Sequence, residues 1–305
     1  MSIIERAVDK LETAKVEASL PERVASPTFQ EAPVDSMFGS PATPPQVGDQ
    51  GNVEPSAADE ISSLRQQPKT VQIDIARLQD LGMLTPDGGR SVIAEEFRYI
   101  KRPLIENAFR KANPIRHGNL IMVTSAMPGE GKTFCAINLA MSIAMEMDHT
   151  VLLVDADVAR PSVPRYFGLE VEGGLMDLLL NEKSDFASVM LNTNVERLRL
   201  LPSGRSHKRA TELLASQAMS NLLEEIATRY PDRIVIFDSP PILLTSEARA
   251  LARQMGQIVV VVAAESTTQH GVKDAINKIG GHPNISLVYN KAKGFPGMGY
   301  YAGYY

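Results

Sequence analysis

Length, composition and charge already exclude several classes of protein. The chain has 305 residues, of which 44% are hydrophobic and 22% are charged, as in ordinary globular proteins. Its net charge of −5 disfavours a nucleic-acid partner, and its single cysteine, Cys135, excludes an intramolecular disulfide and fits a reducing cytoplasm. No run approaches the ~18 apolar residues of a membrane span and no signal peptide opens the sequence, so we expect a partner to hold the protein at any membrane.

Two segments precede the predicted domain. Residues 1–18 predict a short amphipathic helix, opened by a capping box from Ser2 to Glu5. A helix of this length is marginal alone, so docking on a partner and simple fraying are equally open. Residues 19–70 are rich in Pro, Ser, Gln and acidic residues and predict a disordered tether.

The predicted domain covers residues 71–293 and begins with a helical lead-in, residues 71–117. Periodic apolar residues indicate helices near 75–81 and 93–102. Pro103 should kink or stop the second helix, because proline disfavours helical backbone in the residue before it.

The next segment has the pattern of a strand, a phosphate-binding loop and a helix. Residues 119–123 are an apolar strand and 134–147 a helix, and the run between them reads Thr-Ser-Ala-Met-Pro-Gly-Glu-Gly-Lys-Thr. Ala126 replaces the first glycine of G-x-x-x-x-G-K-[ST], at a bend that tolerates a methyl group. A chance Gly-rich turn is disfavoured by the strand before it and the helix after it.

The residue types of this loop suit phosphate chemistry. Gly129 and Gly131 let backbone N–H groups turn toward phosphate oxygens. Lys132 supplies a positive charge at the β- and γ-phosphates, and the Thr133 hydroxyl can hold Mg²⁺. We therefore predict a nucleoside triphosphate site formed by Met127, Pro128, Gly129, Glu130, Gly131, Lys132, Thr133, Phe134 and Asn290.

Beyond the loop, short apolar runs alternate with helical patterns. The strands fall at 151–154, 198–201, 234–237, 258–262 and 285–288, and the helices near 174–181, 209–229, 246–255 and 268–279. Alternation of this kind predicts an α/β fold of the P-loop NTPase class, a parallel sheet with helices on both faces.

Two of the predicted strands end in acidic residues. Asp155 and Asp157 follow one strand, and their spacing points both side chains the same way. Asp238 follows another, as in a Walker B strand whose acid reaches Mg²⁺ directly or through water. A lone aspartate there is more often a cap or turn residue, but three beside a Gly-Lys-Thr loop favour a Mg²⁺-dependent NTPase or phosphotransferase.

The base of the nucleotide is predicted from an absence. Guanine-binding P-loop proteins carry Asn-Lys-x-Asp after a late strand, whereas this chain has Asn-Lys-Ala-Lys from Asn290. ATP is therefore favoured, and the Asn290 amide is a candidate reader of adenine.

The motifs Leu-Leu-Val-Asp-Ala-Asp and Ile-Phe-Asp-Ser-Pro-Pro, spaced as here after the phosphate loop, resemble those of the bacterial tyrosine kinases of the CpsD/CapB type. The wider superfamily includes the ParA and MinD ATPases, which carry a second lysine near the start of the loop. Met127 occupies that place here, which counts against their mechanism.

The last residues carry a tyrosine cluster. Four of the eight tyrosines lie in the final six residues, within a glycine-rich tail, residues 294–305. Taken alone, such a tail also suits simple packing on the surface. The resemblance implies a phosphoacceptor cluster that consists of Tyr300, Tyr301, Tyr304 and Tyr305.

Three charged residues on the second lead-in helix follow the spacing i, i+3, i+6. Glu95, Arg98 and Lys101 would ordinarily be a solvated helix face. They also resemble the Glu-x-x-Arg-x-x-Arg element that joins subunits of the family in a ring, with lysine in place of the last arginine. A lysine cannot reproduce the bidentate contact of arginine.

Other details refine the resemblance. The family has Asp-x-Asp-x-Arg after its first acidic strand, whereas here Ala159 takes the arginine position and Arg160 follows. The phrase Glu-Glu-Phe-Arg-Tyr-Ile-Lys-Arg-Pro-Leu, from Glu95, is most similar to the tyrosine autokinases of exopolysaccharide loci with exosortase systems.

The resemblance implies an ATP- and Mg²⁺-dependent tyrosine autokinase that acts in trans on tail tyrosines. Lys132, Asp155 and Asp157 would be catalytic, with Asp157 either binding metal or accepting the tyrosine proton. Thr133, Asp155 and Asp238 would hold Mg²⁺. The implied partners are other copies in a ring, a membrane polysaccharide co-polymerase that recruits the cytoplasmic chain to the inner membrane, and a tyrosine phosphatase.

Two other functions are compatible with the motifs. A nucleotide-switched scaffold of the ParA or MinD type would hydrolyse ATP without phosphorylating tyrosine. A degenerate regulator would bind ATP without turnover, although the intact Lys132, Asp155 and Asp238 disfavour it.

Overall fold

The structure is a computed structural model of the chain, and it describes residues 69–89, 91–180 and 186–292. All of these residues lie in one compact unit. The predicted N-terminal helix, nearly all of the predicted tether and the tyrosine tail fall outside the described residues.

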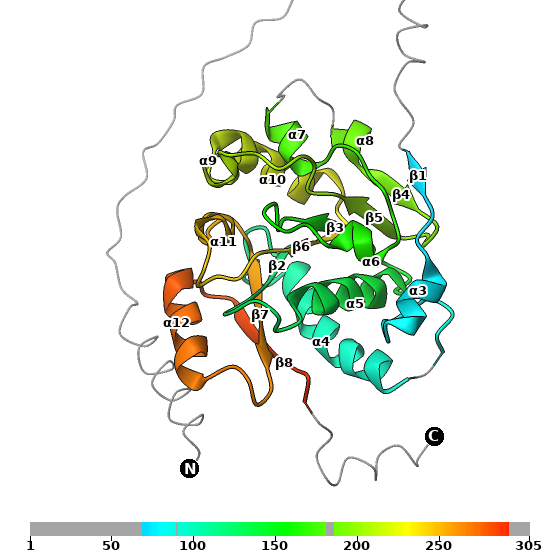
Figure 1. Cartoon of the computed structure of the whole chain (residues 1–305), viewed down its shortest axis with the longest axis horizontal. Coiled ribbons are helices and arrows are strands. Elements are labelled where there is room, and N and C mark those ends of the chain that lie inside the picture. The colour runs from blue at the N-terminus through cyan, green and yellow to red at the C-terminus, as the bar shows by residue number, and fades with distance from the viewer. Residues whose placement is uncertain (1–68, 90, 181–185, 293–305) are drawn as a thin grey trace, which may run out of the picture. The chain divides into compact units, whose positions relative to one another are not determined.

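Within the described residues, an eight-stranded sheet forms the centre of the molecule (Figure 1). Its spatial order is β1-β4-β5-β3-β6-β2-β7-β8, and neighbouring strands are parallel except for the antiparallel pair β4 and β5. The strands are β1 (Thr70–Val71), β2 (Leu120–Ser125), β3 (Thr150–Asp155), β4 (Leu191–Thr193), β5 (Leu198–Leu201), β6 (Arg233–Asp238), β7 (Gln257–Ala263) and β8 (Ile285–Asn290). The predicted fold class is confirmed.

Helices cover both faces of this sheet (Figure 1). One face is covered by α3 (Ile75–Asp80), α4 (Val92–Ala108), α5 (Lys132–Ala144) and α6 (Val163–Tyr166). The other is covered by α7 (Leu175–Leu180), α8 (Phe186–Val189), α9 (Ala210–Leu214), α10 (Gln217–Arg229), α11 (Ser246–Ala252) and α12 (Gln269–Ile279).

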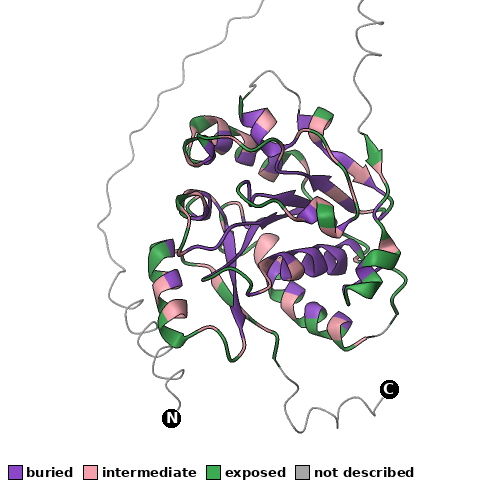
Figure 2. Ribbon diagram, viewed as in Figure 1, coloured by how far each residue is buried: buried purple, intermediate pink, exposed green. Residues whose placement is uncertain are grey.

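The central strands are buried on both faces, which is why they read as continuous apolar runs. In β2, Leu120 and Met122 pack into the core under α7–α12, whereas Ile121 and Val123 pack into the core under α3–α6. All four side chains are fully buried, as the uninterrupted purple of the central strands shows (Figure 2). This double burial fixes the edge at which the polar residues after each strand must emerge.

The predicted helix over residues 209–229 is two helices. α9 ends at Leu214, and α10 begins after Ser216, whose hydroxyl accepts a hydrogen bond from the Met219 N–H at 3.2 Å and donates one to the Leu213 carbonyl at 2.7 Å. Ser216 therefore caps both helix ends and turns the chain between them.

Pro103 was expected to kink or stop its helix, and it does not stop it. α4 continues five residues beyond it, to Ala108. Pro103 lacks the N–H that would bond the Tyr99 carbonyl, but Tyr99 is 77% exposed and water can satisfy that carbonyl. Burial of Leu104 in the core stabilises the continued helix.

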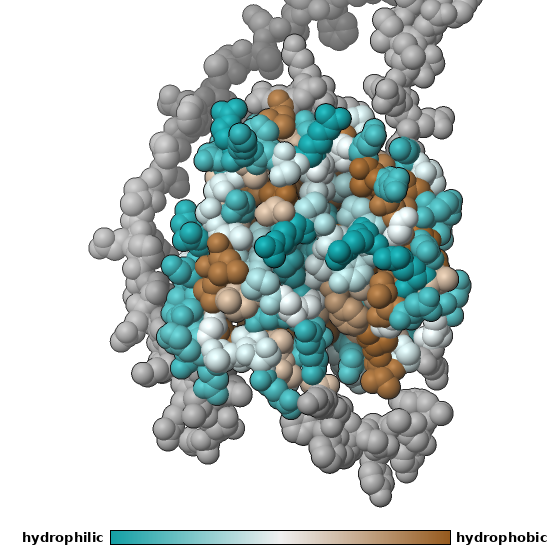
Figure 3. All heavy atoms as spheres, viewed as in Figure 1, coloured by the Kyte–Doolittle hydropathy of each residue, from teal (hydrophilic) through white to brown (hydrophobic). Residues whose placement is uncertain are grey.

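The surface of the view in Figure 3 is mostly hydrophilic, with hydrophobic side chains in separate small areas. Over the described residues, none of the helices combines the length and the apolar character that crossing a bilayer requires.

Candidate phosphoryl-transfer site

The predicted phosphate loop connects β2 to α5. Gly129 and Gly131 have φ of 82° and 98°, a left-handed backbone that side chains with a Cβ avoid. Gly131 is also the N-cap of α5, and no side chain caps that helix end. The first N–H groups of α5 are therefore free to bind an anion, as a phosphate site requires.

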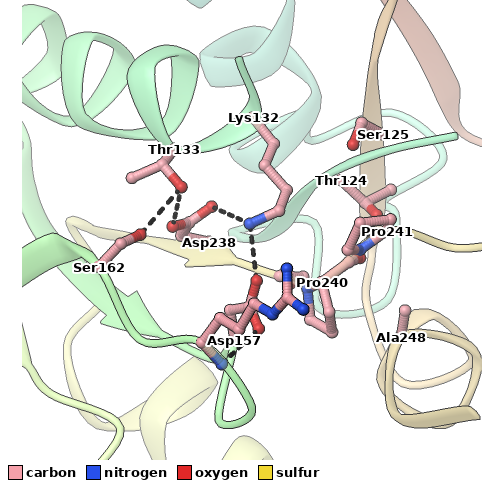
Figure 4. A network of polar contacts seen from close by, with 12 residues as sticks. Thr124, Ser125, Lys132, Thr133, Asp157, Ser162, Asp238, Pro240, Pro241 and Ala248 are labelled. Atoms are coloured by element: carbon pink, nitrogen blue, oxygen red, sulfur yellow. Dashed lines mark hydrogen bonds and ion pairs between the residues drawn. The ribbon is translucent and has the colours of Figure 1, made fainter. Parts of the chain in front are cut away.

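Lys132 and Thr133, the first residues of α5, meet the acids at the ends of β3 and β6 (Figure 4). The Lys132 ammonium lies 2.8 Å from Asp157 Oδ2 and 3.9 Å from Asp238 Oδ1. The Thr133 hydroxyl donates to Asp238 Oδ2 at 2.7 Å. A cation, a hydroxyl and two carboxylates are thus held at one point of the sheet edge.

Asp155 and Asp238 lie side by side because β3 and β6 are adjacent parallel strands with these two residues in register. Asp155 Oδ2 accepts the backbone N–H groups of Ser162 and Val163, at 2.9 and 3.0 Å. Its other oxygen, Oδ1, and Asp238 Oδ1 are buried and have no hydrogen-bond partner. Two carboxylate oxygens without hydrogen-bond partners, together with the Thr133 hydroxyl, fit the oxygen ligands that Mg²⁺ prefers.

In the described part of the chain, no group of three or more His, Cys, Asp or Glu side chains is arranged to hold a metal by itself. Mg²⁺ at phosphate-transfer sites is held by one or two carboxylates together with water and substrate phosphates. Asp155 and Asp238, with Thr133, would supply the protein's share.

Burial raises the pKa of both carboxyls. It raises the pKa of Asp155 to about 6, although backbone hydrogen bonds from Val163 and Ser162 oppose the shift. It raises the pKa of Asp238 to about 7, against the effect of the Lys132 charge. For Lys132 itself, burial opposes the charged form, but the charges of Asp238 and Asp157 outweigh it and raise the pKa.

The raised pKa of Asp238 predicts a pH-dependent stability in metal-free protein. Between 3.8 and about 7, the native state binds a proton at Asp238 that the unfolded chain does not, so stability should fall as the pH rises through this window. Asp238→Asn should remove this component. At pH 8 its free energy of unfolding should therefore exceed that of wild type by more than about 1 kcal/mol. Urea titrations in chelator at pH 5 and pH 8 measure it, with the exposed Asp87→Asn as the control. Equal pH slopes in wild type and Asp238→Asn would contradict the prediction.

The outside of the phosphate loop is held by the end of β8. Asn290 Nδ2 donates to the Glu130 carbonyl at 2.9 Å, and Lys291 Nζ donates to the Gly129 carbonyl at 2.6 Å. Asn290 thus lies at the phosphate loop. Its amide N–H₂ group, the candidate reader of adenine, donates here to the loop backbone. Lys291 was not expected at the site.

The Glu130 side chain braces the loop from within. Its carboxylate accepts the Met127 N–H at 2.8 Å and also contacts the Thr267 hydroxyl, which accepts the Ala263 N–H at 3.0 Å. Glu130 is 4% exposed, whereas Met127 and Pro128 are exposed at the tip of the loop. Glu130 therefore supports the loop, and the exposed tip is available to a ligand.

Ser162 is another residue that the motifs did not single out. Its hydroxyl lies 3.2 Å from the Thr133 hydroxyl (Figure 4). Its N–H donates to Asp155 Oδ2 at 2.9 Å. The turn that carries it is fixed by Asp157, whose Oδ1 accepts the Arg160 N–H at 3.1 Å. The only sequence signal was its place shortly after the acidic pair.

The three charged residues of α4 do not share one exposed face. Glu95 and Arg98 form an ion pair on the surface, with side chains 49% and 46% exposed. Lys101 is 4% exposed; its ammonium donates to the Ser142 carbonyl at 2.6 Å and pairs with Glu146. Lys101 therefore caps the C-terminal end of α5 within its own chain, unlike the exposed Glu95 and Arg98, and its role in a subunit interface stays a prediction.

The loop, the acids and the sheet order together define a P-loop nucleotide-binding domain. Residues 118–287, more than half of the chain, match a family described as an AAA domain. The sequence is 35% identical over 178 residues to tyrosine-protein kinase YwqD of Bacillus subtilis, covering 58% of this chain and 71% of that protein. The chain belongs to the bacterial tyrosine-protein kinase family.

Other relatives agree with this assignment. Putative tyrosine-protein kinase CapB of Staphylococcus aureus is 29% identical over 209 residues, covering 67% of this chain and 87% of CapB. The crystal structure of the chimerical protein CapA2B2 superposes with a TM-score of 0.60 at 28% identity, covering 77% of this chain and 99% of that one. The chain spans only 37% of the length of tyrosine-protein kinase wzc of Salmonella typhimurium, which is 25% identical.

Proposed function

We propose that this protein is an ATP- and Mg²⁺-dependent tyrosine autokinase that phosphorylates tail tyrosines of another copy. The observation that carries the proposal is the meeting of Lys132 and Thr133 with Asp155, Asp157 and Asp238 at one sheet edge. The likeness to proteins named tyrosine-protein kinases supports tyrosine as the acceptor.

The chain's own residues have distinct tasks in this reaction. When ATP binds, the Lys132 ammonium moves its contact from Asp157 to the β- and γ-phosphates, and the free N–H groups at the start of α5 bind phosphate oxygens. Thr133, Asp155 and Asp238 would hold Mg²⁺, which neutralises charge on the transferring phosphoryl group.

Once the Lys132 ammonium has moved to the phosphates, the Asp157 carboxylate has lost its ion-pair partner and can take another. It then either binds the metal through water or accepts the proton of the tyrosine hydroxyl, whose ordinary pKa is about 10. Positioning and electrostatics supply most of the catalysis in such transfers. The acceptors in this proposal are Tyr300, Tyr301, Tyr304 and Tyr305.

Phosphorylation would also control assembly. Each phosphate adds about −1.5 to −2 charges, so four would place roughly −6 to −8 on a tail that docks in a neighbour's phosphate site. We infer that modified copies separate. Glu95 and Arg98, exposed on α4, are the residues of the predicted ring contact that face solvent.

The names of the relatives support a proposal for the biological setting. One of them, 31% identical and matched over 25% of its length, is the succinoglycan biosynthesis transport protein ExoP of Rhizobium meliloti. We propose that this chain regulates exopolysaccharide synthesis or export and that its gene lies in an exosortase-type locus. The phosphoryl donor in this proposal is ATP rather than GTP. A membrane co-polymerase would recruit it from the cytoplasm to the inner membrane, and a tyrosine phosphatase would reverse the reaction.

One experiment separates the kinase from an ATPase scaffold. Purified protein is incubated with Mg²⁺ and γ-labelled ATP, with and without the cytoplasmic segment of the co-polymerase, and phosphotyrosine and free phosphate are both measured. The proposal expects label on tail tyrosines. Free phosphate without phosphotyrosine in both conditions would refute it and favour the scaffold.

A further inference from the structure

We propose that Asn290 and Lys291 are positioning residues of the phosphate loop, which hold its N–H groups toward the nucleotide and so set the affinity for ATP. The proposal deepens the function proposed above only in assuming that the loop binds nucleotide. It makes no claim about the acceptor of the phosphoryl group.

The two side chains donate hydrogen bonds to consecutive backbone carbonyls of the phosphate loop. Lys291 binds the carbonyl of Gly129, and Asn290 binds that of Glu130. In a trans peptide unit, the carbonyl and the N–H of the next residue point in opposite directions. Holding these two carbonyls outward therefore turns the N–H groups of Glu130 and Gly131 to the inner side of the loop.

The loop needs these hydrogen bonds because it contains glycines. Gly129 has a left-handed φ of 82°, and because glycine has no Cβ its backbone dihedral angles are less restricted than those of other residues. Without outside contacts, the loop would sample many orientations and lose entropy on binding phosphate. The two hydrogen bonds remove that freedom before the ligand arrives.

Asn290 and Lys291 are themselves held in place by neighbouring backbone. Asn290 is paired with Ala263 of β7, and its carbonyl accepts the Ala264 N–H at 2.8 Å. A Cβ on Gly131 would lie 2.0 Å from Asn290 Nδ2, so the amide rests directly on the loop backbone. Lys291 has φ of 60°, an uncommon backbone for a lysine that is retained here together with its contact to the loop.

Lys291→Met and Asn290→Asp test the proposal. Methionine keeps the length of lysine without the donor, and aspartate keeps the shape of asparagine but places a carboxylate oxygen against the Glu130 carbonyl. Each should weaken binding of Mg-ATP roughly three- to tenfold, the effect of one lost hydrogen bond. Lys273→Met, on the exposed side of α12, is the matched control and should bind as wild type.

The readouts separate positioning from general stability. Calorimetry gives the Kd for Mg-ATP, and thermal melts give the Tm of nucleotide-free protein, which should stay within about 2 °C of wild type in Lys291→Met because Lys291 is exposed. A raised Kd with an unchanged nucleotide-free Tm supports the proposal. An unchanged Kd in both variants, or an equal rise in Lys273→Met, overturns it. Wild type that binds Mg-ATP but forms no phosphotyrosine would sink the proposed kinase function and leave this inference standing.

Discussion

Lys132→Met is expected to abolish phosphotyrosine formation, by a factor of about 10³ or more, while the protein stays folded. The Lys132 side chain is 13% exposed and its ammonium is the cation nearest to both Asp157 and Asp238 among the described residues. Methionine fills similar volume without the charge. The γ-phosphoryl group would then face the carboxylates with no ammonium to offset their charge during transfer.

The measurement is the initial rate of phosphotyrosine formation at saturating Mg-ATP, with circular dichroism to verify the fold. Lys273→Met serves as the control for loss of an exposed lysine charge and should keep the wild-type rate. A rate in Lys132→Met within tenfold of wild type would show that the ammonium is not central to transfer. Native mass spectrometry of the same samples tests assembly. Lys132→Met, which forms no phosphotyrosine, should remain an oligomer, whereas phosphorylated wild type should separate into smaller species.

Much of the fold and of the site could be predicted because local sequence determines them. Strands buried on both faces must be continuous apolar runs, so β2, β3, β6 and β7 were predicted close to their observed bounds. The acids that follow β3 and β6 must emerge at one edge of a parallel sheet. Their meeting with Lys132 and Thr133 was therefore predictable without knowledge of the strand order.

The features that were missed depend on contacts between distant segments. β1 and β4 have two and three residues, too few to show any periodicity, and they exist because each pairs with a neighbour. Lys291 is polar and exposed, and only the approach of β8 to the loop gives it a partner.

Lys101 is separated from the exposed pair Glu95 and Arg98 for a geometric reason. Six residues along an α-helix correspond to about 600°, so Lys101 lies about 120° around α4 from Glu95 rather than on the same line. That rotation turns it toward α5, where the carbonyl of Ser142 near the helix end needs a donor. A charge pattern on a helix predicts neighbours only where the packing of the helix leaves that face free.

Removal of residues 299–305 is expected to eliminate autophosphorylation while leaving Mg-ATP binding within about twofold of wild type, a difference well under 1 kcal/mol. The deletion removes all four proposed acceptors, Tyr300, Tyr301, Tyr304 and Tyr305, and none of the residues that form the phosphoryl-transfer site. Replacement of the four tyrosines by phenylalanine is the matched control, since it keeps the tail and removes only the hydroxyl groups. Both variants should lack phosphotyrosine, and undiminished phosphotyrosine in either would place the acceptors elsewhere in the chain.

Mixing two inactive chains then tests transfer between copies. Lys132→Met has an intact tail and no transfer centre, and the chain without residues 299–305 has the transfer centre and no tail. If one copy phosphorylates another, the mixture should regain phosphotyrosine, and mass spectrometry should find it on the Lys132→Met chain alone. From Asn290, the fifteen residues to the end of the chain extend at most about 50 Å, enough to reach an adjacent molecule. A mixture that stays silent, while wild type is active under the same conditions, would mean that each molecule phosphorylates its own tail.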